Sequence, residues 1–375
     1  MNTKPWNRFW AACAVAAGLA AATPAAYAQI FIGQTAGFTG PVADGVKETT
    51  EGARLYIDSV NARGGVNGQK IELISLDDKF DPALTTENAR KLIEERNVTA
   101  LFLTRGTPNT EAVIPLLDKH GVALVGPSTG AMSLHKPVRK HVFNVRAPYQ
   151  REAEKAVIHL ASLGVSRLAI VQTDDTFGAD VLIGVQRGLQ ATKLVPVAHE
   201  KFDRAKADFT AMAPKIALAN PQAIIMIASG AATAQGYTAL RAAGSTAQVV
   251  TFSHNASAGF VKSLGNNARG VIVTQVFPNE RATNLPMVRE AQDLAKARQL
   301  EISPAMLEGM AAAKVLVEGL RRAGPKPTRD KMQAALESIQ KFDLGGLELS
   351  YAPDDHSGLD FTDLSIIGTD GKFRR

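Results

Sequence analysis

Short apolar runs alternate with helix-length amphipathic segments through most of this chain. In residues 49–61, for example, Ala53, Ile57 and Val60 recur at about 3.6 residues, the spacing of one helix face. The expected strands are 30–33, 71–76, 100–103, 123–125, 168–171, 223–227, 249–252 and 271–273, and helices are expected at 49–61, 109–119, 151–163, 180–190 and 232–243. Alternation with short links predicts an α/β fold of parallel, doubly wound sheets joined by right-handed crossovers.

The order of elements changes in the last third of the chain. Helical patterns follow one another at 285–298, 304–323 and 328–339, and short strands with turn signals follow from Phe342 onward. One doubly wound sheet needs neither feature, and 375 residues suit two domains. We therefore predict two Rossmann-like lobes that exchange segments. The first should comprise 29–145 and about 279–341, the second 146–274 and about 345–375, with crossings near 146, 275–278 and 341–345.

The N-terminus has the three parts of a secretory signal. Lys4 and Arg8 precede an Ala-rich apolar run, and Ala26-Tyr27-Ala28 offers small residues at a cleavage point. The run is shorter than the roughly 20 residues that a spanning helix needs. The pattern predicts a signal peptide at residues 1–28, cleavage after Ala28 and a periplasmic protein. The only cysteine, Cys13, would leave with the signal.

Charge and histidine spacing exclude several classes of function. The 42 basic and 36 acidic residues are interspersed without a long run of one sign, which predicts a solvated surface and no nucleic-acid partner. The seven histidines show no metal-ligand spacing, so we predict no metal site and no cofactor.

Three loops of the first lobe carry glycine and hydroxyl residues where ligands are expected. Open parallel sheets bind ligands beyond the carboxyl ends of their strands, and a helix N-terminus attracts anions. The candidate residues in these loops are Phe38, Thr107, Ser128, Thr129 and Gly130. The alternative is that the loops are ordinary caps and turns, for which the same residue types are used.

The second lobe offers four further candidates. Phe177 could close over an apolar ligand or staple a helix start, and Ser229 follows the strand at 223–227. His254 follows the strand at 249–252, although a lone histidine is more often a hydrogen-bonded structural residue. Tyr149 lies beside the first predicted crossing and could form an aromatic wall or lie on the surface.

One enzyme motif needs consideration. Residues 126–130 match G-x-S-x-G, the pattern of a hydrolase nucleophile elbow centred on Ser128. An elbow serine leads into a helix, whereas the segment at 131–138 is short and interrupted by Pro137. We therefore predict that the chain is not an enzyme, and a serine hydrolase using Ser128 remains the alternative.

Several segments of the chain resemble a known family. They are G-P-V-A at 40–43, I-D-S-V-N-A-R-G-G-V-N-G at 57–68 and D-D-K-F-D-P at 77–82. Together they resemble the periplasmic solute-binding proteins of ABC importers, in the leucine/isoleucine/valine-binding branch. The resemblance implies a two-lobed Venus-flytrap of the type I fold, a monomer that closes on a small solute and delivers it to an inner-membrane permease. It also implies carboxylate contacts from Thr107, Ser128 and Gly130, beside Thr129, and an aromatic lid at Phe177.

The sequence departs from that branch at one position. Amino-acid binders of this branch usually place an acidic residue after the strand at 249–252, to pair with the ligand ammonium. Here the loop reads Ser253-His254-Asn255, and a buried ammonium without a partner is costly. Asp174 or Asp175 could substitute. The predicted ligand is therefore a branched-chain amino acid or a related aliphatic or aromatic acid without an amine, and ligand sensing for a signalling partner is the alternative role.

Overall fold

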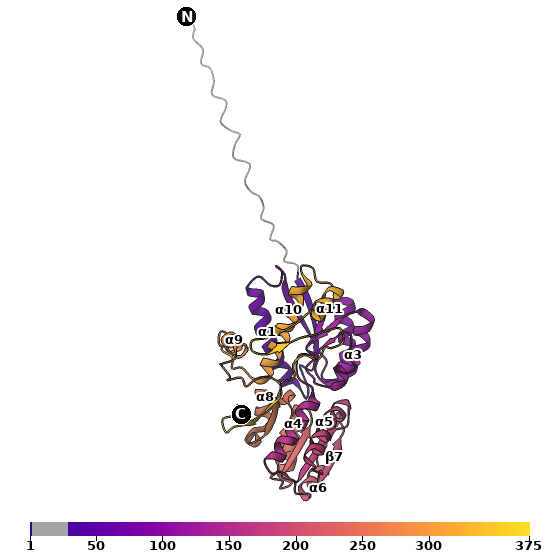
Figure 1. The fold of residues 1–375 in the computed structure, drawn as a ribbon, viewed down its shortest axis with the longest axis vertical. Helices are drawn as coiled ribbons and strands as arrows, with labels where there is room; N and C mark the ends of the chain where they lie inside the picture. Colours follow the sequence, from indigo (N-terminus) through magenta and orange to yellow (C-terminus); the bar gives the residue numbers. More distant parts are fainter. Residues whose placement is uncertain (2–28) are drawn as a thin grey trace.

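Two α/β lobes stacked along the long axis make up the part of the chain that the structure describes (Figure 1). The computed structural model describes Met1 and residues 29–375. The predicted signal peptide therefore lies, apart from Met1, outside the described residues. Within the described residues, no helix is long and apolar enough to span a membrane.

The first lobe is built on a parallel five-stranded sheet in the order β2-β1-β3-β4-β5. Its strands are β1 (Gln29–Ala36), β2 (Lys70–Asp77), β3 (Ala100–Phe102), β4 (Ala123–Val125) and β5 (Val142–Phe143). β3 and β4 are completely buried apolar runs, as expected for strands covered by helices on both faces.

Helices from distant parts of the sequence cover this sheet. They are α1 (Ala43–Ala62), α2 (Pro82–Arg90), continued by a π-helical turn at Lys91–Glu95, α3 (Thr107–His120), α9 (Pro286–Lys296), α10 (Pro304–Ala323) and α11 (Arg329–Glu337). α1 packs closely on α10, because a Cβ atom at Gly309 would lie only 1.7 Å from the carbonyl oxygen of Thr49. Residues of the late helices α9–α11 thus belong to the same core cluster as this sheet.

The second lobe is built on a seven-stranded sheet in the order β14-β13-β10-β9-β8-β6-β7. Strands β6 (Leu168–Thr173), β7 (Ala198–Phe202), β8 (Ala223–Ile227), β9 (Gln248–Thr251) and β10 (Ile272–Gln275) are parallel, and β13 (Asp363–Ile367) and β14 (Phe373–Arg374) are antiparallel. Its helices are α4 (Tyr149–Ser162), α5 (Thr176–Thr192), α6 (Met212–Leu218), α7 (Gly230–Ala242) and α8 (Ala258–Leu264). The C-terminal strands therefore extend the sheet of this lobe at one edge.

Five elements were absent from the sequence prediction: β5, β7, α2, α6 and α8. β7 is an edge strand in which exposed His199 and Lys201 alternate with less exposed residues, so it lacks the apolar run by which the other strands were found. The helices α6 and α8 are only seven residues long, and β5 has only two residues, too few to show a period.

A small hairpin follows α11. β11 (Phe342–Asp343) pairs with β12 (Glu348–Leu349), and Leu344, Leu349, Tyr351 and Leu359 join the core cluster of the first lobe. We therefore propose that the third crossing lies after Leu359, later than 341–345. The lobe boundaries as a whole stay a prediction.

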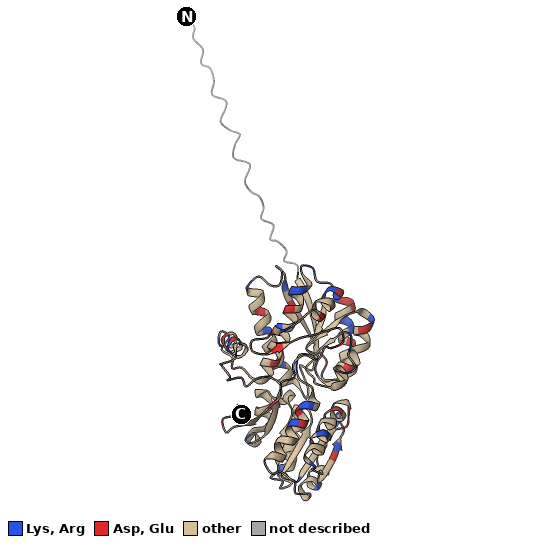
Figure 2. Ribbon diagram, in the orientation of Figure 1, with Lys and Arg blue, Asp and Glu red and all other residues tan. Residues whose placement is uncertain are grey.

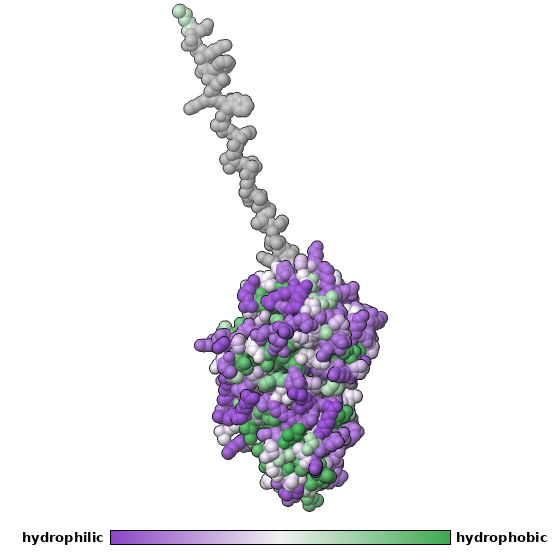
Figure 3. Space-filling model, viewed as in Figure 1, coloured by the Kyte–Doolittle hydropathy of each residue, from purple (hydrophilic) through white to green (hydrophobic). Residues whose placement is uncertain are grey.

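Charged residues of both signs are interspersed over both lobes (Figure 2). The visible surface is mainly hydrophilic, with hydrophobic residues gathered at the tip of the second lobe near α6, where Leu218 is exposed (Figure 3).

Candidate ligand-binding site

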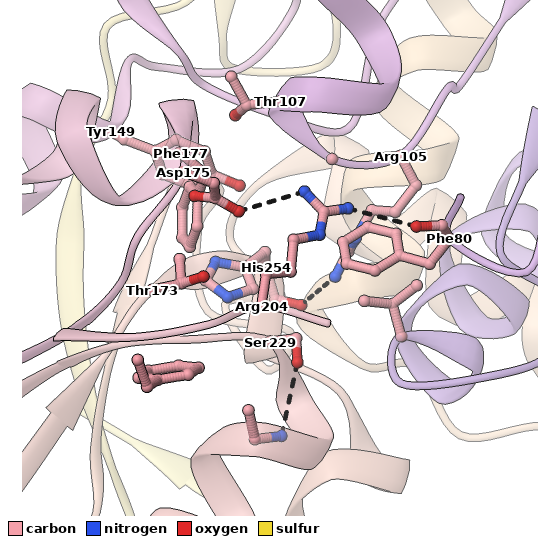
Figure 4. A pocket seen from close by; sticks show the side chains of 14 residues that line it. Phe80, Arg105, Thr107, Tyr149, Thr173, Asp175, Phe177, Arg204, Ser229 and His254 are labelled. Atoms are coloured by element: carbon pink, nitrogen blue, oxygen red, sulfur yellow. Dashed lines mark hydrogen bonds and ion pairs between the residues drawn. The ribbon is translucent and has the colours of Figure 1, made fainter. Parts of the chain in front are cut away.

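A cavity that is partly open to solvent lies where the loops of the two lobes meet (Figure 4). It is lined by residues of both lobes: Val42, Phe80, Arg105, Gly106, Thr107, Tyr149, Thr173, Asp175, Phe177, Phe202, Arg204, Ser229, Ala232 and His254. Most of them lie at or just after the carboxyl ends of strands or at helix N-termini, the edge at which parallel sheets bind ligands.

Arg105, which follows β3, is the buried cation of the first-lobe wall. Its Nη1 donates to the hydroxyl of Ser128 at 3.0 Å, and its Nη2 donates across the cleft to the carbonyl oxygen of His254 at 2.6 Å. Both acceptors are neutral, and Arg105 forms no direct ion pair with an acidic residue in 29–375. Burial lowers the pKa of Arg105, but a guanidinium stays charged in a protein.

The N-terminus of α3 adjoins Arg105. Gly106 has a φ of +89°, and a Cβ atom there would lie 2.5 Å from the Phe80 ring, so a glycine is needed at this approach. The chain then enters α3 at Thr107, whose hydroxyl is 2.8 Å from the hydroxyl of Thr129. The unpaired backbone N–H groups of a helix start favour an anion, as the Arg105 charge does.

An aromatic cluster forms the opposite wall. The Phe177 ring lies 5.1 Å from the rings of both Tyr149 and His254, in edge-to-face arrangements. Burial lowers the pKa of His254 to about 3, so its ring is neutral. Its Nε2 is 2.9 Å from the carbonyl oxygen of Ala228 and therefore carries the proton, which leaves Nδ1 as an acceptor.

Two polar atoms on the cavity wall have no hydrogen-bond partner within the described residues. They are Nδ1 of His254 and Oγ1 of Thr173, and both side chains are more than nine-tenths buried. Buried polar atoms are almost always paired, so these two atoms are available to bond a ligand group or a water in the cavity.

Arg204, in the loop after β7, reaches across the cavity mouth (Figure 4). It pairs with Asp175 of its own lobe at 3.3 Å and donates to Oδ1 of Asn109, in the first lobe, at 2.6 Å. Its guanidinium also lies over the Phe80 ring, 3.8 Å from the centroid. Arg204 therefore ties the two lobes together at the edge of the cavity.

A second group of charges lies behind Tyr149, away from the cavity lining. Arg146 donates to the carboxylate of Glu152 and to the Ser253 hydroxyl, and Glu308 lies 3.7 Å from its Nη1. Ser128 donates to Glu308 at 2.7 Å while accepting from Arg105, so it links this group to the cavity wall.

Other cross-cleft hydrogen bonds surround the cavity. The Glu48 carboxylate accepts from the backbone N–H groups of Ala258 and Gly259, at the start of α8, at 3.0 and 2.8 Å. Asp180 of α5 accepts from the N–H of Met132 at 3.0 Å. The structure therefore shows the two lobes in contact around the cavity.

The structure brings five of the nine predicted site residues to the cavity wall: Thr107, Tyr149, Phe177, Ser229 and His254. Ser128 and Thr129 lie behind that wall, bonded to Arg105 and Thr107 respectively. The Gly130 carbonyl accepts from the N–H of Tyr149 at 2.7 Å, and Phe38 packs on Ala36, Val42 and Val46 outside the lining. That any of the nine contacts a solute stays a prediction.

Nine lining residues were not among the predicted site residues, and they include four with large or polar side chains: Phe80, Arg105, Thr173 and Arg204. Arg105 and Thr173 could have been found, because each stands at the carboxyl end of a predicted strand. Arg204 could not, since β7 has no apolar run and nothing in the sequence marks its loop as the end of a strand. Phe80 enters the lining from the loop after β2 and could have been found by the same rule, because this loop follows the predicted strand at 71–76.

Comparison with known proteins assigns this two-lobed architecture to a family. Residues 29–360 match the model of a periplasmic binding protein family. The chain belongs to the periplasmic binding proteins. It is similar to the Leu/Ile/Val-binding protein BraC3 of Rhizobium johnstonii, at 26% identity over 84% of this chain and 85% of that one. It is a solute-binding protein and not an enzyme, and the Ser128 hydroxyl, bonded to Glu308, serves a buried network.

Solved structures support the same assignment. A substrate-binding periplasmic protein from Ralstonia solanacearum matches with a TM-score of 0.85 and 32% identity, covering 92% of this chain and 99% of the other. An extracellular ligand-binding receptor from Verminephrobacter eiseniae matches with a TM-score of 0.84 and 30% identity, covering 93% and 100%. The type I Venus-flytrap fold of this periplasmic binding protein is thus confirmed.

Proposed function

We propose that this periplasmic binding protein is the solute-binding subunit of an ABC importer. After loss of its signal peptide it would act in the periplasm as a monomer, bind a small carboxylate-bearing solute between its lobes and deliver it to an inner-membrane permease. One observation carries the choice of solute: Arg105 is buried on the cavity wall, beside the start of α3, without a carboxylate partner of its own.

Lobe closure explains how such a subunit signals its loaded state. A ligand that contacts both walls binds the closed form better than the open form and shifts the population toward closure. Arg105 and Arg204 already bridge the lobes in this structure. A carboxylate on Arg105 would add contacts that exist only in the closed form, and the permease would read the surface that closure creates.

The solute class has two candidates at this level. Relatives are named as Leu/Ile/Val-binding proteins, which favours a branched-chain amino acid. The loop Ser253-His254-Asn255 offers no carboxylate for an ammonium, which favours an acid without an amine. Both candidates carry the carboxylate that Arg105 would bind.

A thermal-shift screen tests the proposal. The protein is exported, purified from the periplasm, and unfolded and refolded to remove any carried solute. A compound at about 100 times its dissociation constant adds roughly 2.7 kcal/mol to stability. We expect a rise in Tm with members of a panel of amino acids and aliphatic and aromatic carboxylates. If no member of the panel raises Tm while circular dichroism shows the native fold, the proposal is wrong.

A further inference from the structure

The charges on the cavity wall are unequal in number. The lining contains two cationic side chains, Arg105 and Arg204, and within residues 29–375 only one acidic side chain, Asp175. Asp175 is already engaged, because it pairs with Arg204 at 3.3 Å and caps α5 by accepting from the N–H of Gly178 at 2.9 Å. No acidic group of the lining is therefore left for a ligand cation.

An ammonium group on the ligand would meet unfavourable surroundings. It would lose its hydration in a site that offers no unengaged carboxylate, and two guanidinium groups stand nearby. Removing a charge from water without a partner costs several kcal/mol, and like charges placed together add to that cost. A ligand carboxylate would instead meet favourable surroundings, because the hydrogen bonds of Arg105 go only to neutral acceptors and leave its charge without a carboxylate partner.

The unpaired polar atoms on the second-lobe wall favour a hydrogen-bond donor on the ligand. Nδ1 of His254 can only accept, because the proton of the neutral ring is on Nε2 and faces the Ala228 carbonyl. Oγ1 of Thr173 lies unpaired on the same wall. A ligand hydroxyl group can bond to either atom without bringing a charge into the site. Tyr149, Phe177, Phe202 and Ala232 give the same wall an aromatic and apolar part, which suits an apolar ligand body.

We propose that the solute is an organic acid with an apolar body and no ammonium group, and that Arg105 is the counter-ion of its carboxylate. This inference rests on the proposed function, that the cavity binds a carboxylate-bearing solute, and narrows the class of that solute. It separates this chain from relatives named for branched-chain amino acids.

Two series of compounds that differ in one group test the inference on the wild-type protein. The first is 4-methylpentanoate, 2-hydroxy-4-methylpentanoate and leucine; the second is 3-phenylpropanoate, 2-hydroxy-3-phenylpropanoate and phenylalanine. Within a series only the α-substituent changes, from hydrogen to hydroxyl to ammonium. The amides 4-methylpentanamide and 3-phenylpropanamide remove the negative charge. Titration calorimetry gives each dissociation constant.

In the series that fits the cavity, we expect the amino acid to bind at least about 100-fold more weakly than both amine-free acids, and the amide to bind more weakly than its acid. Leucine or phenylalanine binding as tightly as its amine-free analogue would overturn the inference and leave the proposed function standing. An amide that binds as tightly as its acid would show that Arg105 is not the counter-ion of the carboxylate. If none of the eight compounds binds to folded protein, the inference is wrong and the proposed function loses its support as well.

A variant of Arg105 tests whether its guanidinium group binds the carboxylate of the solute. Arg105→Gln should weaken the acid by about 30-fold and leave the amide nearly unchanged, because only the acid uses the guanidinium charge. The ratio of acid to amide affinity distinguishes this role from a general loss of structure, which would weaken both. Arg289→Gln is the matched control, since Arg289 is an exposed arginine on α9 outside the cavity lining. An unchanged ratio in Arg105→Gln would overturn the assignment.

Discussion

Arg105 and Arg146 are both buried at the junction of the lobes, yet their surroundings differ. Arg146 bonds to Glu152 and lies near Tyr149 and Glu308; burial lowers its pKa, but Tyr149, Glu308 and Glu152 together outweigh burial and raise it. Arg105 bonds directly only to a hydroxyl and a carbonyl, and burial lowers its pKa. Both guanidinium groups are thus buried in the same region. The charge of Arg146 is compensated by carboxylates of the protein, whereas the charge of Arg105 is left for a ligand.

This difference separates a structural arginine from a binding arginine without reference to a ligand. A buried ion pair holds its region together because removing one partner leaves an uncompensated charge. A buried arginine without a carboxylate already bears that cost, and a bound anion relieves it. The comparison therefore predicts opposite outcomes for mutations in the two regions.

The largest effect is expected at Glu152. Its carboxylate accepts from Arg146, from the N–H of Ser253 and from the Thr274 hydroxyl, so Glu152→Ala removes an acceptor from all three and leaves Arg146 without its ion-pair partner at hydrogen-bond distance. We expect a loss of about 3–5 kcal/mol in the free energy of unfolding, measured by urea denaturation. The double variant Glu152→Leu with Arg146→Met should recover part of this loss. A Glu152→Ala protein within about 1 kcal/mol of wild type would contradict the assignment of Arg146 as a structural residue.

A smaller effect, on affinity, is expected at Ser128, which joins the two regions. Ser128 accepts from Arg105 and donates to Glu308. Ser128→Ala should weaken the solute found by the screen by about 1–3 kcal/mol, because Arg105 loses the bond that orients it. Calorimetry measures the affinity, and Thr110→Ala, which removes another buried hydroxyl of the first lobe, is the control. Equal losses of affinity in both variants would show that Ser128 has no special role.

The sequence predicted one of these regions far better than the other. Apolar runs identified most strands, and the rule that ligands bind beyond carboxyl ends selected Thr107 and His254, which both line the cavity. The pairing of Arg146 with Glu308 joins residues far apart in the chain, and neither hydrophobic period nor motif carries information about it. Glu152 sits on the predicted helix at 151–163, but its inward direction depends on the sheet it packs against.

A third and smaller effect is expected at Arg204, which holds the two lobes in contact. It is partly exposed, so each of its polar bonds contributes little. Arg204→Gln should weaken the solute by about 1 kcal/mol and increase the fraction of open protein. Small-angle scattering of the ligand-free variant should show a larger radius of gyration than that of wild type. Lys201→Gln, on the same second-lobe segment but paired only with exposed Asp174, provides the control. If the two variants behave alike, Arg204 does not hold the lobes together.

The smallest expected effect is a dependence of affinity on pH through Asp180. Burial raises the pKa of Asp180 to about 6, helped by nearby Glu111, while hydrogen bonds from Gln150 and Met132 act against it. Because Met132 belongs to the first lobe, part of this burial exists only when the lobes meet. A raised carboxyl pKa means that the closed form holds the proton more tightly, so closure is favoured at low pH and loses stability as pH rises from about 4 to about 6.

Solute affinity should therefore fall a few fold between pH 5 and pH 7.5, with most of the change below pH 6.5. Asp180→Asn keeps an acceptor for Met132 but cannot ionise, so its affinity should vary less over the same range. Calorimetry at four pH values, with an acid that stays ionised throughout, measures both proteins. If the affinities of wild type and Asp180→Asn depend on pH in the same way, the pKa of Asp180 does not change when the lobes separate. Arg105 and Arg204 would then be the charged groups that couple to lobe closure.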